Sequence, residues 1–145
     1  MKKGFTLVEI LVVITIILIL AGIAVPRMKG FRDEANKAKA KAELKILQAA
    51  VESFKNNTGA YPGTTTQLYT DDLGGATPKM VDAVMYDPFV AAGSTEYDYI
   101  LSDNGVYYVI SSVGFDGAGG VTEISAAGAV TKSADDLCVT NGSGC

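Results

Sequence analysis

One acidic residue, Glu9, lies inside an otherwise apolar stretch near the start of the chain. Residues 5–25 are apolar except for Glu9, two threonines and a glycine. A carboxylate costs ~2.5–3.5 kcal/mol near the centre of a bilayer, so a passive membrane anchor would not need one. Cleavage between Gly4 and Phe5 would leave a charged amine four residues from Glu9, on the same helix face. The predicted chemistry is ion pairing, within a chain or between bundled helices, where an unpaired charge is costly.

Two cysteines, Cys138 and Cys145, lie at the C-terminal end with mostly small or polar residues between them. They predict a disulfide, which in the chain-entropy model would stabilise the folded state by roughly 2.5 kcal/mol. Because disulfides persist in oxidising compartments, the pair favours a head outside the cytoplasm. Two unpaired thiols in a mobile tail are the alternative. A zinc site is disfavoured because the chain has no histidine.

The remaining polar residues do not suggest catalysis. The chain has no histidine for acid–base work near neutral pH, and no nucleophile motif, phosphate-binding loop or metal-ligand spacing is evident. Its paired acids lie in turn-like sequence, where solvated carboxylates are expected. The sequence therefore predicts a protein that is not an enzyme and requires no cofactor.

The apolar stretch at residues 5–25 predicts a helix long enough to cross a membrane. Its 21 residues would extend about 30 Å, which matches the hydrocarbon core of a bilayer. Lys2 and Lys3 precede it without an acidic neighbour, so the positive-inside bias keeps the N-terminus in the cytoplasm and sends the rest across. We expect a single membrane pass in contact with lipid.

Residues 26–55 predict the amphipathic half of the same helix, because apolar residues recur at intervals of three and four. An alanine-rich stripe comes first and allows close approach of another helix. A stripe of larger side chains from Leu44 to Phe54 suits the core of a head. Pro26 would bend a continuous helix, and the Asn-Asn-Thr-Gly sequence at 56–59 predicts its end.

Residues 56–145 predict an acidic head. They hold two Lys/Arg and eleven Asp/Glu, whereas residues 1–55 hold ten Lys/Arg and five Asp/Glu. Binding of nucleic acid needs clustered positive charge, so nucleic acid is not an expected partner.

The strand signals of the head lie late in the chain. Residues 96–101 and 106–110 are rich in aromatic and branched side chains and flank an Asp-Asn-Gly hairpin turn. Residues 121–125 and 129–131 predict a second pair. The expected fold is α+β, a long N-terminal helix packed on a small antiparallel sheet. Within the head we expect a loop region at 56–95 with a short helical turn near 80–85, the sheet at 96–132, and a disulfide-closed tail at 133–145.

The start of the chain also resembles a known leader. The sequence Gly4-Phe5-Thr6-Leu7-Val8-Glu9-Ile10, preceded by lysines and followed by the apolar run, is similar to that of type IV pilins and type II secretion pseudopilins. The likeness extends to Pro26, where that family tends to carry a helix-bending proline.

This resemblance implies a pilin fold and a leader at residues 1–4, removed after Gly4 by a prepilin peptidase. It also implies methylation of the new Phe5 amine and assembly guided by Glu9. The implied location is the bacterial inner membrane, followed by a periplasmic or cell-surface filament. The implied partners are further copies of the chain, an inner-membrane assembly platform, and minor pilins or pseudopilins.

Landmarks in the head resemble the major pseudopilin of type II secretion. They are Tyr61-Pro62, Asp87-Pro88-Phe89, Tyr97-x-Tyr99 and the glycine-rich stretch 111–120. In that family the loop after the last aromatic strand binds calcium, which implies Asp116 as a ligand, with Glu123 as a substitute for the second acid. An ordinary glycine-rich turn is the alternative. The cysteine pair departs from this pattern and resembles the disulfide-closed region of true type IV pilins.

We therefore expect a structural subunit of a type IV pilin-like filament, either a type II secretion pseudopilus or a surface pilus. A secretory signal cleaved near residues 22–24 and a plain single-span anchor compete with this interpretation, but neither needs Glu9. A further alternative is a membrane-anchored or secreted binding or adhesin module that does not polymerise. Glu9→Gln would discriminate, because only a filament subunit should lose assembly.

Overall fold

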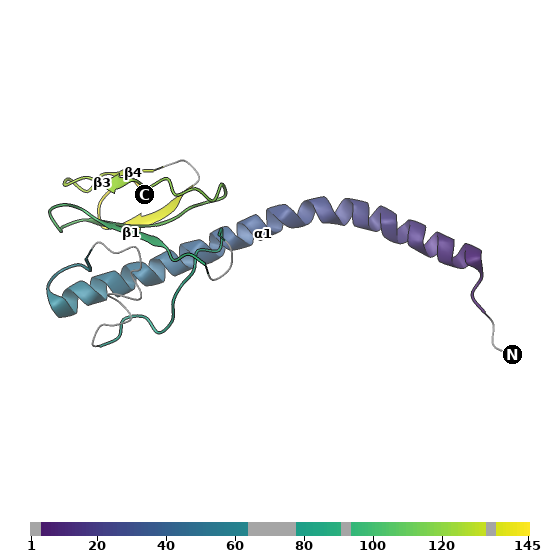
Figure 1. Ribbon diagram of the computed structural model, residues 1–145, viewed down its shortest axis with the longest axis horizontal. Helices are drawn as coiled ribbons and strands as arrows, with labels where there is room; N and C mark the ends of the chain where they lie inside the picture. The colour runs from purple at the N-terminus through teal and green to yellow at the C-terminus, as the bar shows by residue number, and fades with distance from the viewer. Residues whose placement is uncertain (1–3, 64–77, 91–93, 133–135) are drawn as a thin grey trace. The chain divides into compact units, whose positions relative to one another are not determined.

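The computed structural model describes residues 4–63, 78–90, 94–132 and 136–145, without the side chains of residues 24–29. A long helix is followed by small antiparallel sheets, which is the predicted α+β arrangement (Figure 1). The elements in chain order are α1 (Leu7–Thr58), β1 (Asp98–Leu101), β2 (Tyr108–Ser112), β3 (Glu123–Ile124), β4 (Val130–Thr131) and β5 (Leu137–Thr140). By its internal contacts the chain divides into two compact units, residues 1–35 and residues 36–145.

Helix α1 begins and ends with local signals that the sequence supplies. At its start, the Thr6 amide donates to the Glu9 carboxylate (2.9 Å), and the Glu9 amide donates to Thr6 Oγ1 (3.2 Å), which is a reciprocal capping box. At its end, Gly59 adopts a φ of +87° and its amide donates to Lys55 O at 2.7 Å. A left-handed glycine of this kind terminates a helix, so the predicted stop is confirmed.

The larger sheet has the order β1-β2-β5, with both neighbours antiparallel to the central strand β2. Every residue of β2 is buried. Strands β3 and β4 form a separate antiparallel hairpin. The predicted pairing of the first two strands is confirmed, although β1 begins at Asp98 rather than 96 and β2 runs to Ser112. Strand β5 lies in the segment predicted only as a tail.

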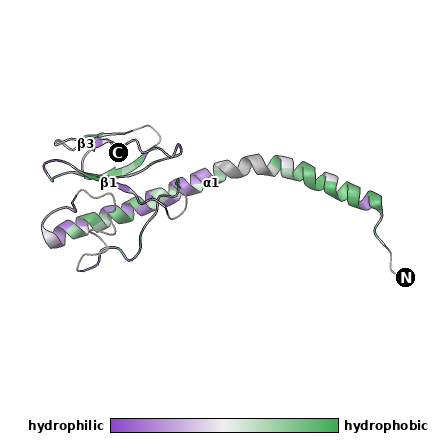
Figure 2. Ribbon diagram, viewed as in Figure 1, coloured by the Kyte–Doolittle hydropathy of each residue, from purple (hydrophilic) through white to green (hydrophobic). Residues whose placement is uncertain are grey.

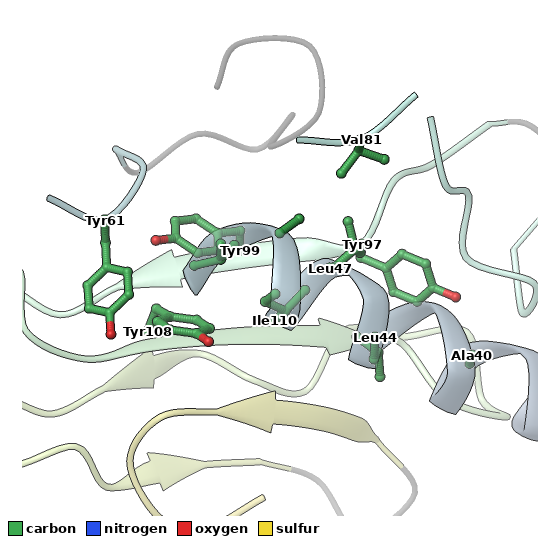
Figure 3. Close-up of a cluster of buried hydrophobic side chains, with 11 residues drawn as sticks. Ala40, Leu44, Leu47, Tyr61, Val81, Tyr97, Tyr99, Tyr108 and Ile110 are labelled. Atoms are coloured by element: carbon green, nitrogen blue, oxygen red, sulfur yellow. The ribbon is translucent and has the colours of Figure 1, made fainter. Parts of the chain in front are cut away.

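The core of the head lies between the second half of α1 and the larger sheet. Figure 3 shows Leu44 and Leu47 of α1 beside Ile110 of β2 and Tyr97, which precedes β1. These side chains are almost completely buried, as is Val51 one turn further along the helix. The predicted apolar stripe of the helix therefore packs in the core, as periodicity requires.

The short helical turn predicted near residues 80–85 is wrong for the described segment 78–90, which holds bends and an isolated bridge. Tyr86 forms that bridge with Glu96, and the Asp87 amide donates to Thr95 O at 3.0 Å. Residues 80–85 bend toward this bridge without forming a helical turn, so tertiary pairing overrides the weak local helical preference. The rest of the predicted loop region, at 64–77 and 91–93, lies outside the described residues.

Candidate functional site

The predicted cleavage site lies just ahead of α1, in backbone that is not helical. Gly4, Phe5 and Thr6 precede the first helical residue, and the Phe5 side chain is 83% exposed. The Glu9 carboxylate turns back toward this segment, where Oε2 accepts bonds from the Thr6 amide and the Thr6 hydroxyl, both at 2.9 Å. Glu9 is thus aimed at the residues that precede the helix.

The first part of α1 presents an apolar surface. Figure 2 shows its mostly hydrophobic colouring. Large apolar side chains such as Leu7, Ile14 and Ile23 are about half exposed or more. Apolar surface of this extent marks a site of contact with lipid or with other protein.

Among the described residues, no helix meets both the length and the hydropathy expected of a membrane span. The span predicted at residues 5–25 stays a prediction. Pro26 lies within the bounds of α1, but its side chain is outside the described part of the chain, so the bend expected there also stays a prediction.

The residues predicted to bind calcium are exposed and lie in different local settings. Asp116 is in the loop after β2, where its Oδ1 accepts a bond from the Ala118 amide at 2.8 Å. Glu123 is on β3. In the parts of the chain that the structure describes, no three His, Cys, Asp or Glu residues are placed together to hold a metal ion.

The two cysteines are joined. Cys138 on β5 and Cys145 form a disulfide with their Cα atoms 5.3 Å apart, which confirms the predicted pair. The bond closes the C-terminal segment back onto the edge strand of the larger sheet.

Asp87 has a structural role that the sequence did not reveal. Its side chain is 1% exposed; Oδ1 accepts a bond from the Phe89 amide (3.0 Å) and Oδ2 one from the Val113 amide (2.9 Å). It therefore ties the turn before β1 to the loop after β2. The Asp-Pro-Phe sequence indicated a turn here, but the bond to Val113 depends on tertiary contacts.

Two acids of α1 hold buried tyrosines of the head. Tyr97 donates its hydroxyl to Glu43 Oε2 at 2.7 Å, and Tyr108 donates to Glu52 Oε1 at 2.9 Å. Burial, and then the neighbouring carboxylate, raise the pKa of both phenols. These bonds fix the sheet on the second half of α1.

Comparison with known proteins gives two family matches. Residues 1–25 match the prokaryotic N-terminal methylation motif, and residues 27–127 match type II secretion system protein G. Type II secretion system core protein G of Escherichia coli (strain K12) is 31% identical over 136 residues, which covers 84% of this chain and 88% of that protein.

Shorter matches involve proteins of the same name. Those of Pectobacterium carotovorum subsp. carotovorum and Klebsiella michiganensis are 38% and 40% identical over 67 residues, or 46% of this chain. Each of these two matches spans less than half of the relative, 43% and 47% respectively.

Proposed function

Because the chain belongs to the family of type II secretion system protein G, and is therefore a structural subunit of a pilin-like filament rather than an enzyme, we propose that its filament is a secretion pseudopilus. The match to protein G carries the choice of a pseudopilus. The exposed apolar surface of α1, with the Glu9 carboxylate bonded to Thr6 just after the predicted cleavage site, supports assembly into a filament. Such a surface has to be covered by lipid before assembly and by other helices afterwards.

Processing would begin at the segment that precedes the helix. A prepilin peptidase would cut after Gly4, and methylation would modify the Phe5 amine. A peptidase needs an accessible, extended substrate, and the non-helical backbone of residues 4–6 supports this role. The new cation would then lie near Glu9, whose carboxylate already accepts two bonds from Thr6.

Assembly would place α1 of one subunit beside α1 of the next. In an apolar bundle the Glu9 carboxylate would be costly without a cation, and the Phe5 amine of a neighbouring subunit would supply one. Pro26 would let the helix adjust to its neighbours. The partners would be further copies, an inner-membrane assembly platform and minor pseudopilins.

The location follows from the same order of events. The chain would cross the bacterial inner membrane once, with its N-terminus in the cytoplasm and its head outside. It would then leave the membrane for a periplasmic filament. The disulfide supports an oxidising location for the head.

Calcium is proposed as a ligand of the loop after β2. Asp116 offers one carboxylate there, and calcium takes six to eight oxygens, many from backbone carbonyls in such loops. Glu123 would supply the second acid. The ion would neutralise acidic charge in the head and restrain the loop.

We expect Glu9→Gln to abolish filaments while membrane insertion and cleavage are retained. Glutamine keeps the size of the side chain and its capacity to accept bonds from Thr6, but it cannot pair with an amine cation. The measurement is electron microscopy of cells that overproduce the secretion system, with mass spectrometry of the membrane-extracted chain.

The matched control is Thr15→Val, which removes a polar group from the same apolar helix, where the Thr15 hydroxyl donates to Leu11 O at 2.8 Å. This variant should form filaments normally. Normal filaments from Glu9→Gln would contradict the charge pairing. A mature chain that retains Met1, or that begins after the apolar stretch, would contradict the proposed processing.

A further inference from the structure

The C-terminal segment that the disulfide closes is bonded to the larger sheet and to the β3–β4 hairpin. We propose that residues 138–145, here called the C-terminal clasp, hold the β3–β4 hairpin on the larger sheet, so that oxidation of Cys138 and Cys145 fixes this part of the head independently of calcium. The proposal concerns the fold of the head alone and does not depend on the filament.

The clasp is hydrogen-bonded to both sheets. Its first residues belong to β5, in which Cys138 lies opposite Ser111 of β2. Further along, Ser143 pairs in parallel with Ala129: its carbonyl accepts from the Val130 amide (3.0 Å), and its amide donates to Gly128 O (2.8 Å). Two residues, Asn141 and Gly142, therefore connect the end of β5 to the residue that pairs with Ala129.

Contact between the clasp and the hairpin is backbone against backbone. A Cβ added to Gly142 would lie 2.1 Å from Gly128 O, and one added to Gly144 would lie 2.8 Å from Val130 O. Gly144 also has a φ of +100°, which other L-residues rarely adopt. The clasp can approach the hairpin this closely only because glycine occupies both positions.

The hairpin has little stability of its own. Each of its strands is two residues long, and an isolated two-stranded hairpin is marginal in water. Ile124 is buried, and Asn104 Nδ2 donates to Ala126 O at 2.8 Å. The bonds from Ser143 add backbone pairing to these contacts, so the clasp is a major support of the hairpin.

The clasp in turn depends on the disulfide. Asn141 fixes its middle, where Oδ1 accepts from the Tyr108 amide and Nδ2 donates to Val106 O, both at 2.9 Å. Beyond Asn141, a short segment held by few hydrogen bonds, such as residues 142–145, opens locally unless a covalent link ties it down. The bond from Cys145 back to Cys138 removes that freedom and keeps Ser143 in register with the hairpin.

The hairpin follows directly on the glycine-rich loop after β2. The loop is restrained at its start by the bond from the Val113 amide to Asp87. The clasp restrains it at its other end through β3 and β4. All of these restraints come from the chain itself.

Hydrogen–deuterium exchange of the full chain in detergent micelles tests the proposal. In the Cys138→Ser/Cys145→Ser variant, the amides of residues 123–131 should exchange about tenfold faster or more, while those of β1 and β2 stay protected. Dithiothreitol should have the same effect on the native chain, because it gives two electrons and two protons to the disulfide and becomes a cyclic disulfide itself. A calcium chelator should speed exchange only in the loop around Asp116, which the proposed ion restrains, and should leave exchange of residues 123–131 in the oxidised native chain unchanged.

Gly144→Ala tests the clasp without touching the cysteines. It should speed exchange of residues 123–131 although the disulfide is intact, whereas Gly63→Ala, at a position with open space around it, should not. If exchange in the double serine variant rises throughout the head, the Gly144→Ala variant is the deciding test. Unchanged exchange of residues 123–131 in Gly144→Ala would then overturn the proposal. Unchanged exchange in a folded double serine variant, or loosening of 123–131 by the chelator, also overturns it.

Discussion

At the scale of single residues, Asp87 and Asp98 show how surroundings can stabilise the charge of one aspartate and destabilise that of another. Both oxygens of Asp87 accept bonds from backbone amides. Asp98 is partly buried, and burial and then the negative charge of Asp87 raise its pKa. Backbone amides thus stabilise the charge of Asp87, whereas burial and the charge of Asp87 destabilise the charged form of Asp98.

We expect Asp98→Asn to stabilise the head near neutral pH. Because the pKa of Asp98 is raised on folding, the folded head binds the proton more tightly than the unfolded chain, and stability falls as pH rises from the ordinary pKa through the raised one. Asparagine carries no charge, so the advantage of the variant should grow over that window. Thermal unfolding by circular dichroism should show a larger gain in Tm at about pH 7 than at about pH 3.

The matched substitution at the neighbouring acid should act in the opposite direction. In Asp87→Asn, the amide nitrogen would face a backbone N–H of Phe89 or Val113, which leaves a buried donor unsatisfied and costs about 1–3 kcal/mol. A gain in Tm from Asp87→Asn, or a gain from Asp98→Asn that does not change with pH, would contradict this assignment of the two acids.

At the scale of elements, sequence reasoning succeeded where the signals are local. The end of α1 follows from Asn56 to Gly59, and the β1–β2 hairpin from the turn at Asn104 and Gly105. The residues nearest to chemistry, Glu9 and the two cysteines, also stand out by type and spacing.

Elements that depend on distant partners were missed. Strand β5 has four residues and, in the described part of the chain, pairs with β2, about 28 positions earlier, so no turn or alternation marks it. The role of Asp87 was missed for the same reason, because the amide of Val113 reaches it only in the folded head. The prediction of a helical turn near residues 80–85 was wrong because the pairing of Tyr86 with Glu96 outweighs the local helical preference.

The loop after β2 is the element on which the calcium proposal can be tested. Calorimetry of the full chain in detergent should detect calcium binding that Asp116→Ala removes, since calcium depends on carboxylate oxygens. Asp103→Ala is the matched control, because Asp103 is an exposed acid in the β1–β2 turn, and it should leave binding unchanged. Absence of calcium binding in the unmodified chain would contradict the proposal. Asp116 would then serve only to accept the hydrogen bond of the Ala118 amide in an ordinary turn.

At the scale of the whole molecule, the helix has two roles that divide along its length. Its first part belongs to the unit of residues 1–35 and exposes apolar side chains. Its second part belongs to the unit of residues 36–145 and buries Leu44, Leu47 and Val51 in the head. A single helix thus supplies a surface for other molecules and half of the core of its own head.

This division predicts that residues 36–145 fold without the first part of the chain. The fragment keeps every helix residue of the buried core cluster, from Ala40 to Val51, together with the disulfide. Produced in an oxidising compartment, it should be monomeric by sedimentation and unfold in one cooperative thermal transition. A shorter fragment that begins at Ile46 is the control: it lacks Leu44, and loss of one buried leucine side chain costs about 2–5 kcal/mol out of a total stability of about 5–15 kcal/mol. The shorter fragment should therefore unfold at a clearly lower temperature or without cooperativity, and equal transitions for the two fragments would show that the core does not depend on this part of α1.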